Sequence, residues 1–154
     1  MSNPSGDPML IYATAIALDG HAVLLRGFSG TGKSDLGLRL IDAGGRLVAD
    51  DQCEIHPRDG TLMVRAPLAL AGLIEVRGLG IVRLDAMPEA PLALIADLVP
   101  SNLIERMPMR RSERILGVTV PVTAIAPFEA SAPAKLRIAL AALTGLGPVA
   151  LLAD

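Results

Sequence analysis

The sequence predicts an α/β domain with a mixed β-sheet and few helices. Short apolar segments bounded by turn residues recur along the chain, apolar residues follow a helical repeat in two places, and a glycine-rich loop precedes the first of these repeats. The 154 residues, 51% of them hydrophobic and 19% charged, suit one domain with a well-filled core. We therefore expect a single domain over residues 9–154, after a flexible N-terminus at residues 1–8.

The first half of the chain is expected to form paired strands around one helix. Asp19-Gly20 is a hairpin signal between two apolar segments. Within residues 34–43, Leu36 and Leu40 lie one helical turn apart, and Gly44-Gly45 ends the helix. The strands expected here are residues 9–18, 21–26 and 46–49.

The second half is expected to add strands and a C-terminal helix. Pro57-Arg-Asp-Gly60 is a second hairpin signal, and Gly78 and Gly80 bend the chain after a short strand. Ser131-Ala-Pro133 is typical of a helix start, and the apolar face that follows ends at Gly145. The strands expected here are residues 53–56, 62–64, 73–76, 92–98 and 115–125.

Charge and apolar patterning exclude several classes of protein. A net charge of -2 gives no broad attraction for nucleic acid or anionic lipid, so we expect neither as a partner. No uninterrupted apolar stretch approaches the ~20 residues that span a bilayer, and the polar start does not resemble a secretory signal. The single Cys53 is expected to be a packed core residue. These features predict a cytoplasmic protein.

The loop Gly27-Phe28-Ser29-Gly30-Thr31-Gly32-Lys33-Ser34 predicts a phosphate-binding site. Its glycines let backbone N–H groups converge on phosphate oxygens, and the positive end of the following helix points at them. Lys33 could reach the β- and γ-phosphates, and the hydroxyl of Ser34 could bind Mg²⁺. The strand before the loop and the helix after it are the context that this motif requires. We therefore expect ATP with Mg²⁺ as the ligand.

Acidic and basic residues elsewhere are candidates for the same site. Asp50 and Asp51 follow a predicted strand, where they could serve a metal or accept a proton, or form a solvated acidic turn. Glu75 in an apolar segment could bind a metal or substrate, or pair with Arg77 on the same strand face. A basic cluster could contact phosphate or lie solvated; it comprises Arg106, Arg110, Arg111 and Arg114.

Three ordered motifs together resemble the catalytic domain of bacterial HPr kinase/phosphorylase. They are Gly27-Phe-Ser-Gly-Thr-Gly-Lys-Ser34, Arg46-Leu-Val-Ala-Asp-Asp51 and Ile74-Glu-Val-Arg-Gly-Leu-Gly-Ile81, within a similarity that covers residues 10–143. The resemblance implies a P-loop kinase domain of the HPr kinase and PEP carboxykinase-like type.

The resemblance also implies roles for individual residues. Lys33 would hold the phosphates, and Ser34 with Glu75 would bind Mg²⁺. Asp51, with Asp50 beside it, would take the proton from a substrate serine, and Arg106 would be the catalytic arginine. The implied substrate is HPr or an HPr-like phosphocarrier protein of the phosphotransferase system.

Further implications concern the reverse reaction and the assembly. Family members also use inorganic phosphate to remove the serine phosphate, with release of pyrophosphate, and their catalytic domains form hexamers. The short form without an N-terminal domain resembles the alphaproteobacterial version, whose partner is a phosphocarrier of the nitrogen-type system. The chain departs from the family pattern at Tyr12 and Gly45, where the family has histidines, and at residues 126–131, where it has a basic segment linked to dephosphorylation.

Two other functions fit the same residues. One is a regulatory nucleotide-binding module that has lost catalysis, because Tyr12 and Gly45 supply no imidazole. The other is a small-molecule kinase that uses the same phosphate cradle.

Overall fold

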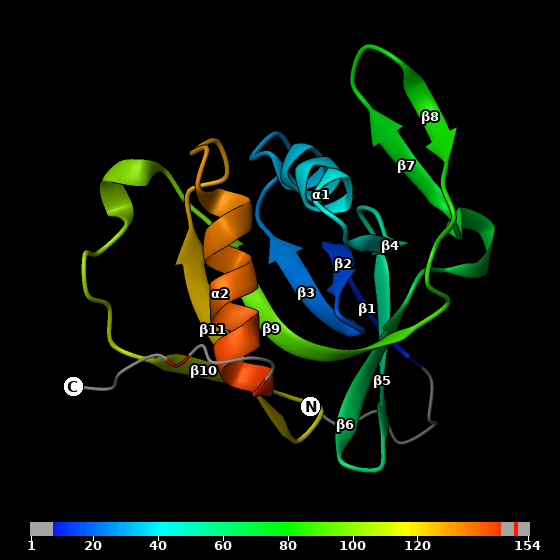
Figure 1. The fold of residues 1–154 in the computed structure, drawn as a ribbon. Helices are drawn as coiled ribbons and strands as arrows, with labels where there is room; N and C mark the ends of the chain where they lie inside the picture. The colour runs from blue at the N-terminus through cyan, green and yellow to red at the C-terminus, as the bar shows by residue number, and fades with distance from the viewer. Residues whose placement is uncertain (1–7, 146–149, 151–154) are drawn as a thin grey trace.

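The computed structural model describes residues 8–145 and Ala150. This part of the chain contains two α-helices and eleven strands; nine of the strands form a mixed sheet, and both helices cover one face of it (Figure 1). The helices are α1 (Lys33–Asp42) and α2 (Ala132–Thr144), with short 3-10 turns at Leu68–Leu70 and Ser101–Leu103. The predicted flexible N-terminus, apart from Pro8, lies outside the described residues.

One sheet holds most of the strands. Its order is β1-β5-β6-β9-β3-β2-β4, and β11 continues it from β9 and pairs with β10. A separate hairpin, β7–β8, projects from the body beside α1 (Figure 1). The strands are β1 (Met9–Ile11), β2 (Thr14–Leu18), β3 (His21–Arg26), β4 (Arg46–Ala49), β5 (Cys53–Arg58), β6 (Thr61–Arg65), β7 (Leu73–Val76), β8 (Gly80–Arg83), β9 (Ala90–Leu98), β10 (Arg111–Ile115) and β11 (Val118–Ile125).

The central strands are parallel. β3 pairs with β9, and β9 pairs with β11, in the parallel sense, whereas the remaining pairs are antiparallel. The predicted α/β class and mixed sheet are therefore confirmed. Because parallel strands end at the same edge of a sheet, the connections after β3, β9 and β11 begin side by side. The connection after β3 is the glycine-rich loop of the candidate site.

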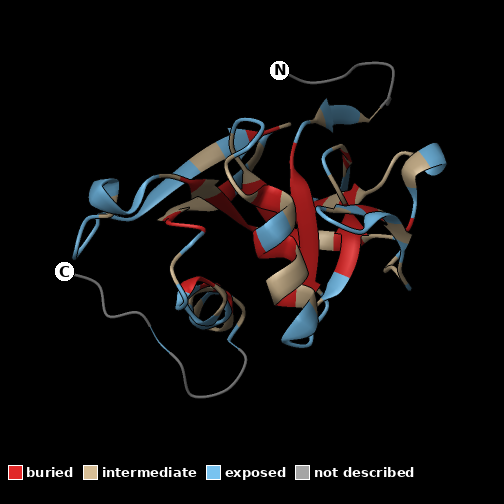
Figure 2. Cartoon of the chain, turned by 90° about the horizontal axis from the view of Figure 1, so that it is seen from above, coloured by how far each residue is buried: buried red, intermediate tan, exposed pale blue. Residues whose placement is uncertain are grey.

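Two buried clusters fill the two faces of the sheet. Alternate residues of β2 and β3 face α1 and α2, where Ile16 and Leu25 pack with Leu36 and Leu136. The intervening residues, such as Leu24, pack into a second cluster on the opposite face, with side chains of β5, β6, β10 and β11. Figure 2 shows buried residues concentrated in the central strands, with exposed residues at the outer turns.

The hairpin predicted at Asp19-Gly20 is confirmed. Leu18 pairs with His21, and both turn residues have positive φ, 49° for Asp19 and 80° for Gly20, as a two-residue turn requires. The strand predicted over residues 9–18 is in fact two strands. β1 leaves the β2–β3 hairpin and pairs with β5, with Ile11 opposite Cys53.

Two other strand predictions need correction. The strand predicted over residues 115–125 is a hairpin, because Leu116 and Gly117 adopt φ values of 48° and 81° between β10 and β11. The apolar pattern hid this turn since Ile115 and Val120 on its two sides are both buried. The second predicted hairpin has a tighter turn, at Asp59-Gly60. Pro57 lies within β5, beyond Ile55, the last β5 residue that pairs with β1. The missing N–H of the proline therefore costs no hydrogen bond between these two strands.

Within the described part of the chain, neither helix has the length and apolar character needed to cross a membrane.

Candidate functional site

The glycine-rich loop connects β3 to α1, as predicted. Gly30 and Gly32 have φ values of 84° and 99°, a left-handed conformation that glycine adopts without steric cost. The amide of Thr31 donates to Phe28 O at 3.1 Å, and no side chain caps α1, which begins at Lys33. The first N–H groups of the helix therefore have no side-chain acceptor, which suits an anion.

Close packing also restricts the loop to small residues. A Cβ atom built on Gly27 would lie 2.6 Å from Thr31 Oγ1, and one built on Gly32 would lie 2.9 Å from Phe128 Cζ. A larger residue at either position would therefore displace the Thr31 hydroxyl or the Phe128 ring. At Gly32 the positive φ also favours glycine.

The ammonium group of Lys33 is held within the loop. Its side chain is buried, and Nζ donates a hydrogen bond of 2.7 Å to Gly27 O. This bond provides a buried cation with an acceptor, and it keeps the charge beside the helix N-terminus. A phosphate group entering the loop would find this charge already in place.

Asp50, at the end of β4, joins three separate elements. Its Oδ1 accepts hydrogen bonds from Ser34 Oγ at 2.7 Å and from Thr14 Oγ1 at 3.0 Å, while Oδ2 accepts one from the backbone N of Glu75 at 3.1 Å. The structure thus brings together Ser34, Asp50 and the backbone of Glu75, which the sequence had placed in one predicted site.

Asp51 differs from its neighbour in orientation. Its φ of 66° turns the chain out of the strand direction, and the residue is exposed. Its backbone N donates to Thr14 Oγ1 at 3.3 Å, whereas its carboxylate has no hydrogen bond within residues 8–145. The two adjacent acids are therefore distinct: Asp50 is occupied by protein donors, and Asp51 is free to meet a ligand.

Thr14 is a site residue that the sequence analysis missed. It is fully buried, and its hydroxyl contacts both acidic residues. The signal in the sequence was a lone hydroxyl within an apolar strand, which needs a buried hydrogen-bond partner.

The predicted ion pair between Glu75 and Arg77 is absent from the described structure. β7 ends at Val76, so Arg77 lies in the turn and no longer shares a strand face with Glu75. Both residues are exposed. The Glu75 side chain therefore remains available to a ligand, although only its backbone contacts Asp50.

The side-chain oxygens beside the loop suit a magnesium ion that is also coordinated by a phosphate. Within residues 8–145, no three His, Cys, Asp or Glu side chains are grouped as a metal site. Mg²⁺ is commonly held by one or two protein oxygens together with water and substrate phosphates. The Ser34 hydroxyl and the Asp50 carboxylate, adjacent to the loop, fit that requirement.

Arg106 is not brought into contact with these residues. It is exposed in the connection between β9 and β10 and makes no hydrogen bond or ion pair with the rest of the described chain. Two other arginines of the predicted cluster, Arg111 and Arg114, lie on β10, where Arg114 Nη2 donates to Gly117 O at 3.0 Å. The cluster is therefore divided between a connection and a strand.

An ion-pair network at the end of β3 was also missed. Arg26 forms paired hydrogen bonds to Asp97, at 2.7 and 3.1 Å, and to Glu113, at 2.8 and 2.9 Å. Hydrogen bonds to these two carboxylates raise the pKa of Arg26, and the same guanidinium lowers the pKa of Glu113. The network joins β3, β9 and β10 directly before the glycine loop, which fixes the base of the loop.

Cys53 is confirmed as a packed core residue. It is fully buried and lies 3.2 Å from Ala13 O, and burial, with the nearby charges of Asp50 and Asp51, raises the pKa of its thiol to about 12. A thiol that stays protonated is a poor nucleophile.

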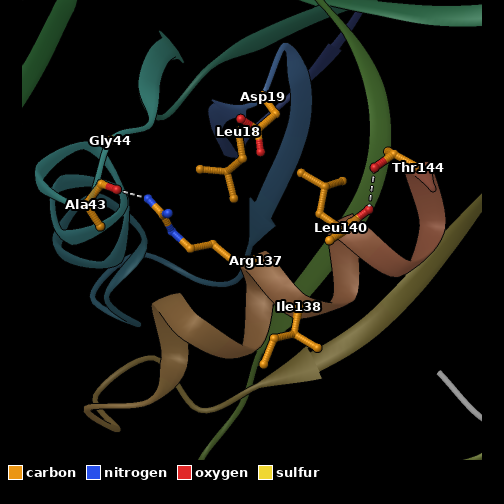
Figure 3. A pocket seen from close by; sticks show the side chains of 9 residues that line it. Leu18, Asp19, Ala43, Gly44, Arg137, Ile138, Leu140 and Thr144 are labelled. Atoms are coloured by element: carbon orange, nitrogen blue, oxygen red, sulfur yellow. Dashed lines mark hydrogen bonds between the residues drawn. The ribbon is translucent and has the colours of Figure 1, made fainter. Parts of the chain in front are cut away.

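A cavity of about 300 Å³ lies away from this site. It is at the C-terminal end of α1, where Arg137 of α2 donates to Ala43 O and Leu18, Ile138 and Leu140 supply apolar walls (Figure 3). None of the predicted site residues lines it. The candidate site is instead an open surface at the N-terminal end of the same helix.

Comparison with known proteins identifies relatives of this chain. The family model for the HPr Serine kinase C-terminal domain matches residues 8–134. HPr kinase/phosphorylase of Limosilactobacillus reuteri is 35% identical in an alignment of length 127 that covers 75% of this chain and 40% of that protein. The protein of the same name from Geobacillus thermodenitrificans is 33% identical in an alignment of length 123 that covers 72% of this chain and 40% of that protein.

A solved structure agrees with these matches. The Hpr(Ser) kinase/phosphatase from Coxiella burnetii has a TM-score of 0.74 and 27% identity, covering 83% of this chain and 91% of that chain. The curated relatives named above are longer, since the match spans about 40% of their length. The P-loop, the mixed sheet and these similarities lead to one conclusion: the chain belongs to the HPr serine kinase C-terminal domain family.

Proposed function

We propose that this chain is an ATP-dependent kinase that phosphorylates a serine of HPr or an HPr-like phosphocarrier protein. The observation that carries the proposal is the 2.7 Å hydrogen bond between Ser34 Oγ and Asp50 Oδ1, because it joins the phosphate loop to an acidic strand end. The names of the relatives support the acceptor. The reaction would take place in the cytoplasm.

The residues divide the work of phosphoryl transfer. Loop amides and Lys33 would hold the triphosphate, and the Lys33 ammonium would exchange Gly27 O for a phosphate oxygen. Ser34 and Asp50, with the exposed Glu75 nearby, would hold Mg²⁺, which neutralises charge on the phosphates when bound.

Asp51 would act as the general base. Its free carboxylate would take the proton of the substrate serine hydroxyl while that oxygen attacks the γ-phosphorus. The bond between the γ-phosphorus and the bridging oxygen breaks, and ADP leaves with the electron pair. Arg106, which is exposed on the connection between β9 and β10, is the residue that the family resemblance proposes for the transferring phosphoryl group.

The test is transfer of labelled phosphate from ATP to an HPr-like carrier, read by mass spectrometry as phosphoserine. Lys33→Ala should abolish transfer. Asp51→Asn should keep nucleotide binding but lower the rate by a factor of about 10²–10⁴, the usual contribution of a general base. Full activity of Asp51→Asn would reject this residue as the base.

Asp59→Asn is the matched control for that variant. Asp59 is also exposed and also has a positive φ, 52°, but it lies in the β5–β6 turn. Because asparagine tolerates this conformation well, neither substitution should unfold the chain. The control should therefore transfer phosphate at the unmodified rate.

A second candidate is a nucleotide-binding module without turnover. It is favoured by the surroundings of Gly45, where a Cβ atom would lie 2.9 Å from both Leu40 O and Leu18 Cδ2, so a histidine does not fit. The two histidines of the chain are engaged elsewhere, His21 with Asp19 O and His56 beside Arg58 and Glu89. ATP binding with no phosphoserine on any HPr-like carrier would support this candidate.

Two further properties implied by the family resemblance can be measured on this chain: removal of the serine phosphate by inorganic phosphate, and assembly into a hexamer. Incubating the phosphorylated carrier with inorganic phosphate would release pyrophosphate if the phosphorylase activity is present. Sedimentation of the purified chain would measure its oligomeric state.

A further inference from the structure

The aromatic side chains of this protein lie at its surface. The sequence contains two phenylalanines, one tyrosine and no tryptophan, and their exposed fractions are 89% for Phe28, 71% for Phe128 and 63% for Tyr12. The buried core is therefore built from aliphatic residues. An exposed ring gives no information by itself, but Phe128 lies directly against the phosphate loop.

One edge of this ring packs against the loop. A Cβ atom on Gly32 would lie 2.9 Å from Phe128 Cζ and 3.2 Å from Cε1, so the ring packs on the glycine next to Lys33. Most of the ring nevertheless remains open to solvent. One part of it rests on the loop, and the rest presents an aromatic surface beside it.

The segment that carries Phe128 is anchored at both ends. Arg39 of α1 donates to Pro127 O and, at 3.4 Å, to Glu129 O. The Glu129 carboxylate forms an ion pair of 2.9 Å with Lys135 of α2. The backbone on both sides of Phe128 is thus tied to the two helices before any ligand arrives, which reduces the entropy lost when the ring binds one.

Phe128 lies on the opposite side of the loop from the acidic residues. Asp50 approaches from β4, next to β2, and contacts β7. Phe128 follows β11, which pairs with β9, and β9 lies on the other side of β3 from β2 and β4. A triphosphate that lies across the loop with its γ end at the acids would have its nucleoside on the β9 and β11 side, where the ring lies.

The chemistry of the segment suits a base better than a phosphate. Residues 126–131 contain no cationic side chain, and their one charged group, Glu129, is paired with Lys135. The segment itself thus adds an apolar π face but no cation, and the cations beside it, Arg39 and Lys135, are engaged with its own oxygens. Aromatic rings bind nucleobases by stacking, which tolerates any base but increases with the area of overlap.

We propose that Phe128 is the stacking platform for the base of the nucleotide, and hence the residue that sets base preference. The inference rests on the proposed nucleotide binding. Stacking predicts that ATP and GTP bind with similar affinity, and that both bind more tightly than CTP or UTP because a purine covers more of the ring.

The experiment compares ATP with inorganic tripolyphosphate, which has the phosphates but no nucleoside. Binding of each, with Mg²⁺, is measured by calorimetry for the unmodified chain and for Phe128→Ala and Phe128→Tyr. Phe128→Ala should weaken ATP about tenfold, within the usual contribution of a stacked base, and leave tripolyphosphate unchanged. Phe128→Tyr should retain ATP binding and the preference for purines.

Leu68→Ala provides a matched control. Leu68 is 93% exposed on the Leu68–Leu70 turn, so this variant also loses an exposed apolar side chain, but it should bind both ligands normally. Thermal unfolding midpoints of all variants would show that the fold is intact.

The possible outcomes separate this inference from the proposed function. Equal weakening of ATP and tripolyphosphate would overturn the inference, because the ring would then act only by packing on Gly32. Unchanged ATP affinity in Phe128→Ala, or equal affinity for all four nucleotides, would also overturn it while leaving the kinase intact. If the unmodified chain bound neither ligand, the proposed function itself would fall.

Discussion

Replacing Thr14 by valine would remove one buried hydroxyl while keeping the shape of the side chain. That hydroxyl donates to Asp50 Oδ1 at 3.0 Å and accepts from the backbone N of Asp51 at 3.3 Å. A hydrogen bond to a charged group contributes about 1.5–3 kcal/mol, and a neutral one about 0.5–1.5 kcal/mol. Because Asp50 is only half-buried and the second bond is long, we take the lower value of each. The expected loss is about 2 kcal/mol.

The loss should be visible in both stability and catalysis. Urea unfolding of Thr14→Val should show a free energy of unfolding lower by about 2 kcal/mol with an unchanged m-value. If the same energy orients the two acids for transfer, the rate falls by up to about 30-fold, since 1.36 kcal/mol corresponds to a factor of ten. Phosphate transfer to the carrier at saturating ATP measures this rate.

Thr14→Ser separates the hydroxyl from the methyl group. The methyl packs closely on α1, where a Cβ atom built on Gly37 would lie 3.1 Å from Thr14 Cγ2. Serine should therefore lose about 1 kcal/mol of stability through the missing methyl, but keep the transfer rate. Equal transfer rates for the valine and serine variants would refute the role assigned to the hydroxyl.

Three other predictions follow from single contacts. Because Arg26 lowers the pKa of Glu113, the stabilisation is present above the unfolded value of 4.5 and is lost as pH falls through the folded pKa. Arg26→Gln should therefore lower the free energy of unfolding at pH 7, and this free energy should fall less steeply below pH 4.5 than in the unmodified chain. Urea unfolding at a series of pH values measures both effects. An unaltered pH profile would contradict the ion pair between Arg26 and Glu113. Cys53 should resist a thiol reagent at pH 8 until urea is added, and rapid labelling of the folded chain would contradict its burial. Gly45→Ala should lower the thermal midpoint, at a cost of about 1–3 kcal/mol, because its Cβ would press on Leu40 O, which belongs to the backbone of α1. An unchanged midpoint would show that the backbone yields easily.

Local sequence patterns were sufficient for the elements that depend on neighbouring residues. The phosphate loop, the Asp19-Gly20 hairpin and both helices lie where predicted, within one or two residues at their ends. The reason is that positive-φ glycines, turn residues and helical repeats act over a few positions. The pattern failed at Leu116, a bulky residue at a positive φ, because an apolar sequence on both sides concealed the turn.

The sequence by itself determined the loop that could cradle phosphate, the residues Lys33 and Ser34 within it, and the acidic pair at the end of a strand. Only the tertiary structure decided what these residues meet. Strand register placed Thr14 next to Asp50, 36 positions away, and the positive φ of Asp51 turned that residue out of the strand direction. The connection between β9 and β10 left Arg106 without a contact, within the described residues, to the acids it was expected to join. Because successive side chains of a strand point to opposite faces, a shift of one residue in pairing would exchange these neighbours, and no local pattern specifies that pairing.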